Sequence, residues 1–156
     1  MLLCQISDLH IKSRGENAYR VVDTAESLRR CVAHIGSLPT APDAIVITGD
    51  LVEGGHADEY ALLRELLAPL PLPVYVIPGN HDERSAMRQA FADQPWMAQG
   101  GERIEYVIDA HPLRIVALDT VIPRRGGGQL AAESMAWLDA TLAQAPATPT
   151  VVIMHH

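Results

Sequence analysis

Side chains that can bind metal ions or transfer protons follow four apolar segments of the chain. They stand in the short motifs Asp8-Leu9-His10, Gly49-Asp50, Gly79-Asn80-His81-Asp82 and His155-His156. Taken singly, most of these motifs are weak signals, because Asp, Asn and Gly are also ordinary turn residues and a histidine pair can belong to a purification tag. Their recurrence after four separate segments indicates one site assembled from all of them.

The types of these side chains point to metal chemistry on a phosphate. Carboxylate, amide and imidazole groups suit Zn, Mn or Fe rather than soft ions. Two divalent ions about 3.5–4 Å apart can clamp a phosphate and generate a hydroxide. A carboxylate shared by both ions must hold them so close, and Asp50, on a predicted central strand, is the expected bridge. Asn80 would add a neutral oxygen, which limits the negative charge of the site.

The segments that precede the motifs read as buried β-strands. Five apolar runs span residues 2–6, 44–48, 74–77, 113–118 and 150–154. Most of them are continuous rather than alternating, which is typical of strands buried on both faces. A sixth run, 103–108, alternates more and predicts an outer strand. Helical spacing lies between the runs, at 28–38, 60–70, 83–91 and 131–142, with Asp23 or Thr24 as the first N-cap.

This alternation of strand and helix predicts an α/β layered domain, in which sites form at the carboxyl ends of the strands. The length of 156 residues suits a single domain, residues 1–156. The formal net charge of −7 disfavours a nucleic-acid polymer as partner. No apolar run is long enough to span a membrane. The two cysteines, Cys4 and Cys31, are too few for a disulfide framework. From these observations together we expect a cytoplasmic protein that does not bind a membrane.

The motifs resemble those of the calcineurin-like metallophosphoesterase superfamily, whose pattern is Asp-x-His, Gly-Asp, Gly-Asn-His-Asp/Glu, His and Gly-His-x-His. The resemblance covers the whole chain and is greatest to the cyclic-nucleotide phosphodiesterase and bacterial dinuclear glycerophosphodiesterase branch. The opening 16 residues and the segments Leu118-Asp119-Thr120, Gly128-Gln129-Leu130 and Trp137-Leu138 are similar to this branch.

The resemblance implies an αββα sandwich, in which two mixed sheets meet and helices cover the outside. It implies two divalent or trivalent ions (Fe, Mn, Zn or Co) that activate a hydroxide for attack on a small phosphodiester, either a cyclic nucleotide or a glycerophosphodiester. Carried over residue by residue, the first ion is held by Asp8, His10 and Asp50, and the second by Asp50, Asn80 and His155. The resemblance makes His81 the catalytic residue, as a proton donor or electrostatic stabiliser beside the phosphate.

One motif of the superfamily, Gly-His-x-His, does not occur in the sequence. We therefore expect a chain truncated at its C-terminus, without the last strands of the second sheet. Such a chain would expose an apolar edge, which favours association into a homo-oligomer. Two alternatives stay open: a non-catalytic metal-binding or interaction fragment, and a metallophosphoesterase of another substrate class, such as a nuclease or a phosphomonoesterase.

Overall fold

The computed structural model describes residues 1–99 and 101–156. Its first sheet contains three parallel strands in the order β1-β2-β3: β1 (Leu3–Ile6), β2 (Ala44–Thr48) and β3 (Val74–Ile77). Every residue of the central strand β2 is buried. Strand β1 is only half-buried, because it lies at one edge of the sheet. The expectation of burial on both faces therefore holds for β2 and not for β1.

The second sheet has the order β4-β5-β6 and mixes both strand directions. Strand β4 (Tyr106–Ile108) pairs antiparallel with β5 (Arg114–Ala117), which pairs parallel with β6 (Thr150–Ile153). The predicted strand over 103–108 is thus real but begins three residues later. Strand β6 is half-buried at three of its four positions, as is expected of an edge strand.

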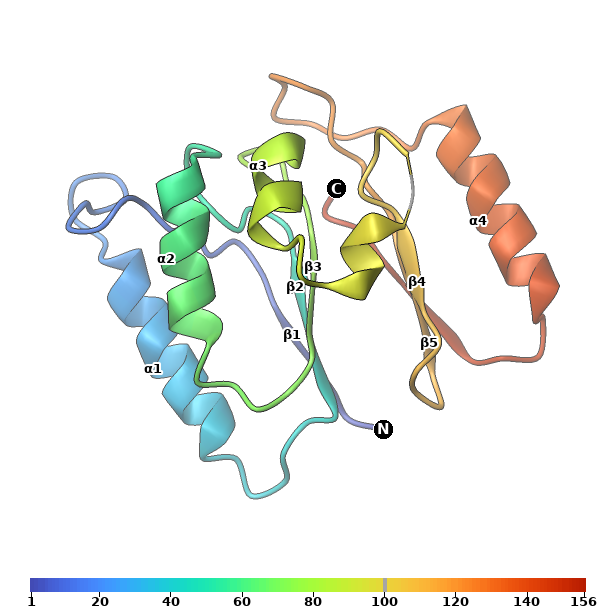
Figure 1. Ribbon diagram of the computed structural model, residues 1–156, viewed down its shortest axis with the longest axis horizontal. Helices are drawn as coiled ribbons and strands as arrows, with labels where there is room; N and C mark the ends of the chain where they lie inside the picture. The colour runs from blue at the N-terminus through green and yellow to red at the C-terminus, as the bar shows by residue number, and fades with distance from the viewer. Residues whose placement is uncertain (100) are drawn as a thin grey trace.

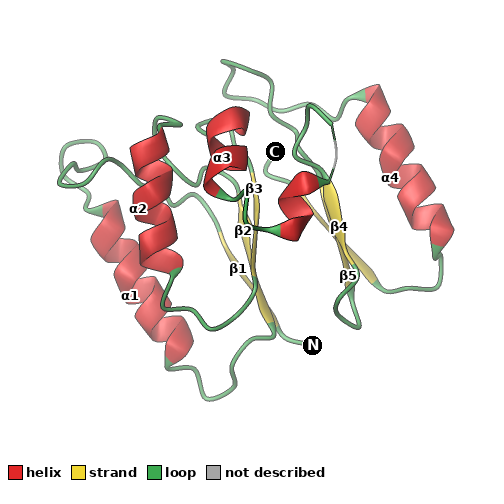
Figure 2. Cartoon of the chain, viewed as in Figure 1, coloured by secondary structure: helices red, strands yellow, loops and turns green. Residues whose placement is uncertain are grey.

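Helices cover the outer faces of the two sheets (Figures 1 and 2). Helices α1 (Thr24–Gly36) and α2 (Ala57–Leu67) lie on the side of the first sheet, and α4 (Ala132–Gln144) lies on the side of the second. The short helix α3 (Arg84–Ala90) packs against α2, and a 3₁₀ turn that the sequence did not predict, η1 (Pro95–Ala98), contacts β4. The expected α/β architecture with two sheets is confirmed.

Local sequence explains the clearest of these boundaries. Asp23 caps α1, because its side chain accepts a hydrogen bond from the backbone N–H of Glu26 at 2.8 Å. The buried face of α1 carries Leu28, Val32 and Ile35, which recur at steps of three and four. No helix in residues 1–99 or 101–156 combines the length and the apolar composition that crossing a bilayer requires.

The two sheets share one apolar core. Tyr106 of β4 is buried, and its hydroxyl donates a hydrogen bond to the carbonyl oxygen of Val76 in β3 at 2.8 Å. The Trp96 ring from η1 lies 4.7 Å from the ring of Tyr106. This packing fixes the two sheets against each other, so the carboxyl ends of β1, β2, β3 and β6 face a common region.

Candidate metal centre

Three of the predicted ligands meet at the ends of strands from both sheets. One ligand atom each from Asp8, Asp50 and His155 lies within 4.8 Å of the others. Asp50 Oδ2 lies 3.5 Å from His155 Nε2, and Asp50 is 5% exposed. A buried carboxylate is costly unless it is paired or binds a cation, so the donor set fits a metal ion.

His10 approaches the same carboxylate oxygen of Asp50. Its Nε2 lies 3.7 Å from Asp50 Oδ2, while its Nδ1 lies 2.8 Å from Glu53 Oε2. Because a carboxylate only accepts hydrogen bonds, Nδ1 carries the hydrogen and Nε2 is left with its lone pair. Both imidazoles therefore direct Nε2 toward one oxygen of Asp50, and the bridging role of Asp50 stays a prediction.

The backbone at these positions adopts an unusual conformation. Asp8, His10 and Asp50 have φ angles of +56°, +46° and +49°, a region that residues other than glycine rarely occupy. Backbone hydrogen bonds hold it, from the Asp8 N–H to the Gly49 carbonyl at 3.1 Å and from the His10 N–H to the Asp50 carbonyl at 3.0 Å. Such conformations cost roughly 1–3 kcal/mol each and concentrate at functional sites.

Close packing of the loop after β3 explains the glycine at position 79. A Cβ on Gly79 would overlap Oδ1 and the backbone nitrogen of Asp50. In the same loop, the backbone N–H of His81 donates a hydrogen bond to Asp50 Oδ1 at 3.0 Å. The Gly-Asn-His-Asp loop thus rests directly on the predicted bridging carboxylate.

We expect Gly79→Ala to displace Asp50 and to weaken metal binding severely. The added methyl meets backbone as well as a side chain, so small rotamer changes cannot relieve it. Isothermal titration with Mn²⁺ and Zn²⁺ measures the loss. Gly36→Ala is the matched control, because a Cβ at Gly36 meets nothing within 4 Å; equal metal affinity of the two variants would contradict the assignment.

Asn80 contacts His156, whereas the sequence analysis grouped Asn80 with His155 as ligands of the second ion. Asn80 Oδ1 lies 3.3 Å from His156 Nε2, and His156 Nδ1 lies 2.9 Å from Thr120 Oγ1. Burial, together with the neighbouring His155, lowers the pKa of His156; a neutral imidazole is the form that binds metals. The sequence left the role of His156 open, and its placement makes it a further candidate ligand.

His155 is oriented by the strand beside it. Its Nδ1 lies 2.7 Å from the Thr48 carbonyl oxygen, so that nitrogen carries the hydrogen and Nε2 is directed to Asp50. A Cβ on Gly49 would overlap this imidazole, and the φ of Gly49 is +92°. Glycine therefore makes room for a ligand that arrives from the second sheet.

His81 lies beside the centre with one nitrogen held by the backbone. Its Nδ1 lies 2.8 Å from the Glu53 carbonyl oxygen, and its ring stands 4.8 Å from the His10 ring. Burial acts to lower the pKa of His81, but the bond to the Glu53 carbonyl and the carboxylates of Asp50, Glu53 and Asp82 together raise it. A raised pKa is the direction that a proton donor requires.

Glu53 is a functional candidate that the sequence analysis missed. Besides the bond to His10, its Oε2 lies 3.8 Å from His81 Nδ1, and ligand atoms of these three residues lie within 4.8 Å of one another. Glu53 follows Asp50 by three residues in the same loop after β2. That spacing was the available signal, although a lone glutamate in a loop seldom stands out.

Asp82, the last residue of the third motif, points inward. Its Oδ2 accepts hydrogen bonds from the N–H groups of Leu51 at 3.0 Å and Gly79 at 2.8 Å, and its Oδ1 accepts one from the Tyr60 hydroxyl at 2.9 Å. Burial raises the pKa of Asp82 to about 6 in spite of these donors. Asp82 therefore ties the loops after β2 and β3 together and contributes no ligand atom to the groups above.

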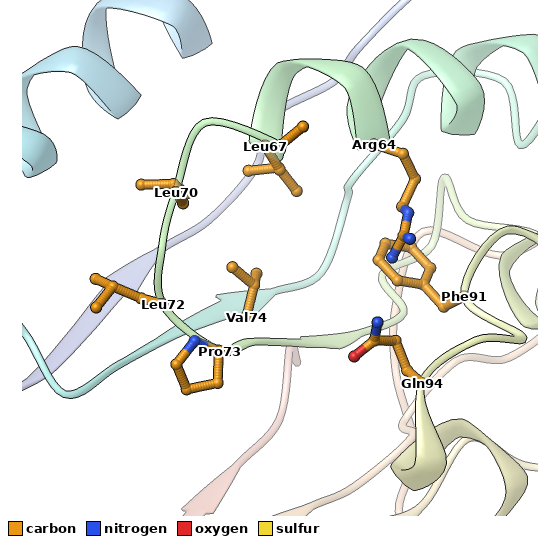
Figure 3. Close-up of a pocket in the computed structure, with 9 residues that line it drawn as sticks. Arg64, Leu67, Leu70, Leu72, Pro73, Val74, Phe91 and Gln94 are labelled. Atoms are coloured by element: carbon orange, nitrogen blue, oxygen red, sulfur yellow. The ribbon is translucent and has the colours of Figure 1, made fainter.

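A hollow of about 220 Å³ lies at the opposite end of the first sheet (Figure 3). Its apolar lining comes from the end of α2 and the start of β3. Arg64 covers one side, with its guanidinium 5.1 Å from the centre of the Phe91 ring. Among the described residues that line it, the hollow has no acid, imidazole or thiol.

Comparison with known proteins identifies the family. The family model described as calcineurin-like phosphoesterase matches residues 1–156. The chain is 36% identical over its full length to a probable glycerophosphodiester phosphodiesterase of Arcobacter nitrofigilis, covering 57% of that protein. It is 33% identical to a glycerophosphodiester phosphodiesterase of Enterobacter lignolyticus, covering 56% of it. A 3′,5′-cyclic adenosine monophosphate phosphodiesterase of Pseudomonas aeruginosa is 32% identical and 55% covered.

The chain therefore belongs to the calcineurin-like phosphoesterase family, and the predicted resemblance to its cyclic-nucleotide and glycerophosphodiester branch is confirmed. It spans somewhat more than half the length of these curated relatives.

Proposed function

We propose that the protein hydrolyses small phosphodiesters at a dinuclear metal centre to which this chain contributes most of the ligands. The observation that supports the proposal is that one oxygen of a buried carboxylate, Asp50 Oδ2, lies 3.7 Å from His10 Nε2 and 3.5 Å from His155 Nε2. Two cation sites that share a carboxylate are the arrangement needed to clamp a phosphate.

The proposed ligands divide between two ions. Asp8, His10 and Asp50 hold the first, and Asp50, Asn80 and His155 hold the second, with His156 as an additional candidate beside Asn80. These oxygen and nitrogen donors suit Fe, Mn, Zn or Co. The proposal is supported by the orientation of His10 and His155, which both hold Nδ1 in a hydrogen bond and leave Nε2 toward Asp50.

Bound ions would supply Lewis acidity, which neutralises phosphate charge and lowers the pKa of a water molecule. The protein residues supply the rest. Glu53 fixes the tautomer of His10 through its carboxylate and the orientation of His81 through its carbonyl oxygen. His81 thereby keeps its Nε2 available to give a proton to the leaving oxygen.

Small phosphodiesters suit the chain better than polymers because its net charge is −7, which repels an extended phosphate backbone. The named relatives support both glycerophosphodiesters and cyclic nucleotides as substrates.

Turnover of bis(4-nitrophenyl) phosphate after loading with Mn²⁺, Zn²⁺ or Co²⁺ tests the proposed function. We expect hydrolysis of this diester to depend on added metal and to exceed that of the monoester 4-nitrophenyl phosphate. Preference for the monoester would favour a phosphomonoesterase. Tight metal binding without any turnover would favour a non-catalytic metal-binding module.

We expect Glu53→Gln to weaken binding of the first metal ion by about 10–100-fold, the usual cost of losing a partner that orients a metal-bound histidine. Glutamine can accept a hydrogen bond from His10 but does not stabilise it with a charge. Competition with a chromophoric chelator measures the affinity. Glu65→Gln is the matched control, since Glu65 pairs with Arg14 at the exposed surface; equal affinities in both variants would contradict the role of Glu53.

A further inference from the structure

An ion pair joins the first helix turn after the Gly-Asn-His-Asp loop to the second sheet. Arg84, the first residue of α3, donates from Nε to Asp119 Oδ2 at 2.6 Å and from Nη2 to Asp119 Oδ1 at 2.8 Å. The same Nη2 donates to the Val121 carbonyl oxygen at 2.8 Å. Asp119 follows β5 and is 0% exposed. Its carboxylate also accepts hydrogen bonds from the N–H groups of Ile104 and Val121, each at 3.0 Å.

The residue inside this clamped segment is Thr120, and it contacts the predicted metal centre. Thr120 Oγ1 lies 2.9 Å from His156 Nδ1 and accepts a hydrogen bond from the His156 backbone N–H at 3.4 Å. His156 Nε2 then lies 3.3 Å from Asn80 Oδ1. Asn80 precedes Arg84 by four residues, so the contacts form a closed circuit that crosses between the sheets twice.

We propose that the Arg84–Asp119 ion pair is a positioning device, which fixes Thr120 and, through Thr120, the imidazole of His156 against the side-chain oxygen of Asn80. The inference rests on the proposed function and deepens it. It names the residues that keep the donor atoms of Asn80, which follows the first sheet, and His156, which follows the second, at a fixed distance from each other. Arg84 and Asp119 act through Thr120 and His156 and are therefore positioning residues.

The planar guanidinium is the part of the device that lysine cannot replace. Arg84 bonds both carboxylate oxygens and a carbonyl oxygen at once, which fixes the direction of the Asp119 side chain as well as its distance. A lysine keeps the charge but binds as a single point. Arg84→Lys therefore loosens the geometry without leaving the buried Asp119 unpaired, an outcome that Arg84→Ala would risk.

The ring nitrogens of His156 report its position without any metal ion. Asn80 Oδ1 can only accept a hydrogen bond, so in the metal-free protein it favours the hydrogen of the neutral ring on Nε2. The Thr120 hydroxyl can then donate to Nδ1. The nitrogen chemical shifts distinguish this tautomer from the alternative, and they change if either contact loosens.

The test compares wild type, Arg84→Lys, Thr120→Val and the double variant of the full 156-residue chain. Imidazole ¹⁵N spectra of the metal-free proteins and titrations with Mn²⁺ and Zn²⁺ are recorded for each. We expect both single variants to shift the His156 ring nitrogens and to weaken one of two metal-binding steps by roughly 10–100-fold. Because both changes interrupt one path, the double variant should be no weaker than the worse single one.

Arg64→Lys is the matched control. Arg64 forms an ion pair with Asp93 at 2.8 Å beside the hollow in Figure 3, at the far end of the sheet. Its partner is 54% exposed, whereas Asp119 is 0% exposed. We expect Arg64→Lys to leave both the His156 shifts and the metal titration as in wild type.

Three outcomes decide between the inference and its alternatives. Unchanged His156 shifts in a folded Arg84→Lys protein would overturn the positioning role. Additive losses in the double variant would also overturn it, since they mean that Arg84 and Thr120 act separately. Absence of metal binding in wild type would reject the proposed function alone, because the ring-nitrogen shifts still show whether Arg84 positions His156.

Discussion

Asp50→Asn is expected to remove both metal ions together. Asp50 Oδ2 lies within 4 Å of Nε2 of both His10 and His155, and a neutral amide oxygen bridges two cations poorly. The substitution keeps the shape of the side chain and an oxygen that can accept the His81 backbone N–H. We expect the loss of affinity to exceed the roughly 10–100-fold cost of losing an outer partner. Elemental analysis of the dialysed variant gives the metal content per chain.

The matched variant Asp8→Asn separates bridging from ordinary ligation. Asp8 is exposed and belongs to the group with Asp50 and His155, but we assign it to the first ion alone. We therefore expect Asp8→Asn to retain one ion under conditions where Asp50→Asn retains none. Two tightly bound ions in Asp50→Asn would show that the bridge lies elsewhere.

The sequence predicted positions best where a candidate ligand residue comes directly after a strand. The run 44–48 is wholly apolar up to Thr48, and it became the fully buried β2, with Asp50 delivered at its carboxyl end. Parallel pairing of β1, β2 and β3 then places Asp8, Asp50 and Asn80 at one end of one sheet. These positions follow from the strand period and sheet topology alone.

The parts that escaped prediction depend on contacts between distant segments. Glu53 gains its role only because the loop after β2 folds over His10, 43 residues away in sequence. The Arg84–Asp119 pair spans 35 residues and crosses between sheets. Neither contact produces a periodic pattern in the sequence. A single charged residue in a loop looks the same in the sequence whether its side chain contacts another protein group or only water. The half-burial of β1 and β6 also escaped, since an apolar run does not tell an edge from a centre.

The inward direction of Asp82 shows the same limit within a motif. From its position in the Gly-Asn-His-Asp motif, Asp82 could be expected to point into the site as Asn80 and His81 do. The structure instead directs its carboxylate at Leu51, Gly79 and Tyr60. Three donors arranged around one buried carboxylate could be recognised only after the loops were placed.

His81→Ala is expected to retain both metal ions and the fold while losing roughly 10²–10⁴ in rate, the usual contribution of a general acid. The ring of His81 is held by the Glu53 carbonyl oxygen and stands beside His10, so its removal leaves the proposed ligands in place. Metal content and kcat are measured on the same preparation. His34→Ala, at an exposed position near the end of α1, is the control and should leave both unchanged.

The choice of leaving group distinguishes a proton donor from an electrostatic stabiliser. A 4-nitrophenolate leaves readily without a proton, whereas the alkoxide of a glycerophosphodiester or a cyclic nucleotide is strongly basic and needs one. If His81 donates a proton, the loss in His81→Ala must therefore be much larger for an alkyl diester than for bis(4-nitrophenyl) phosphate. If His81 only stabilises phosphate charge, the two substrates lose similar factors. Loss of metal in His81→Ala would instead make it a ligand, in the group that the structure also forms from His10, Glu53 and His81.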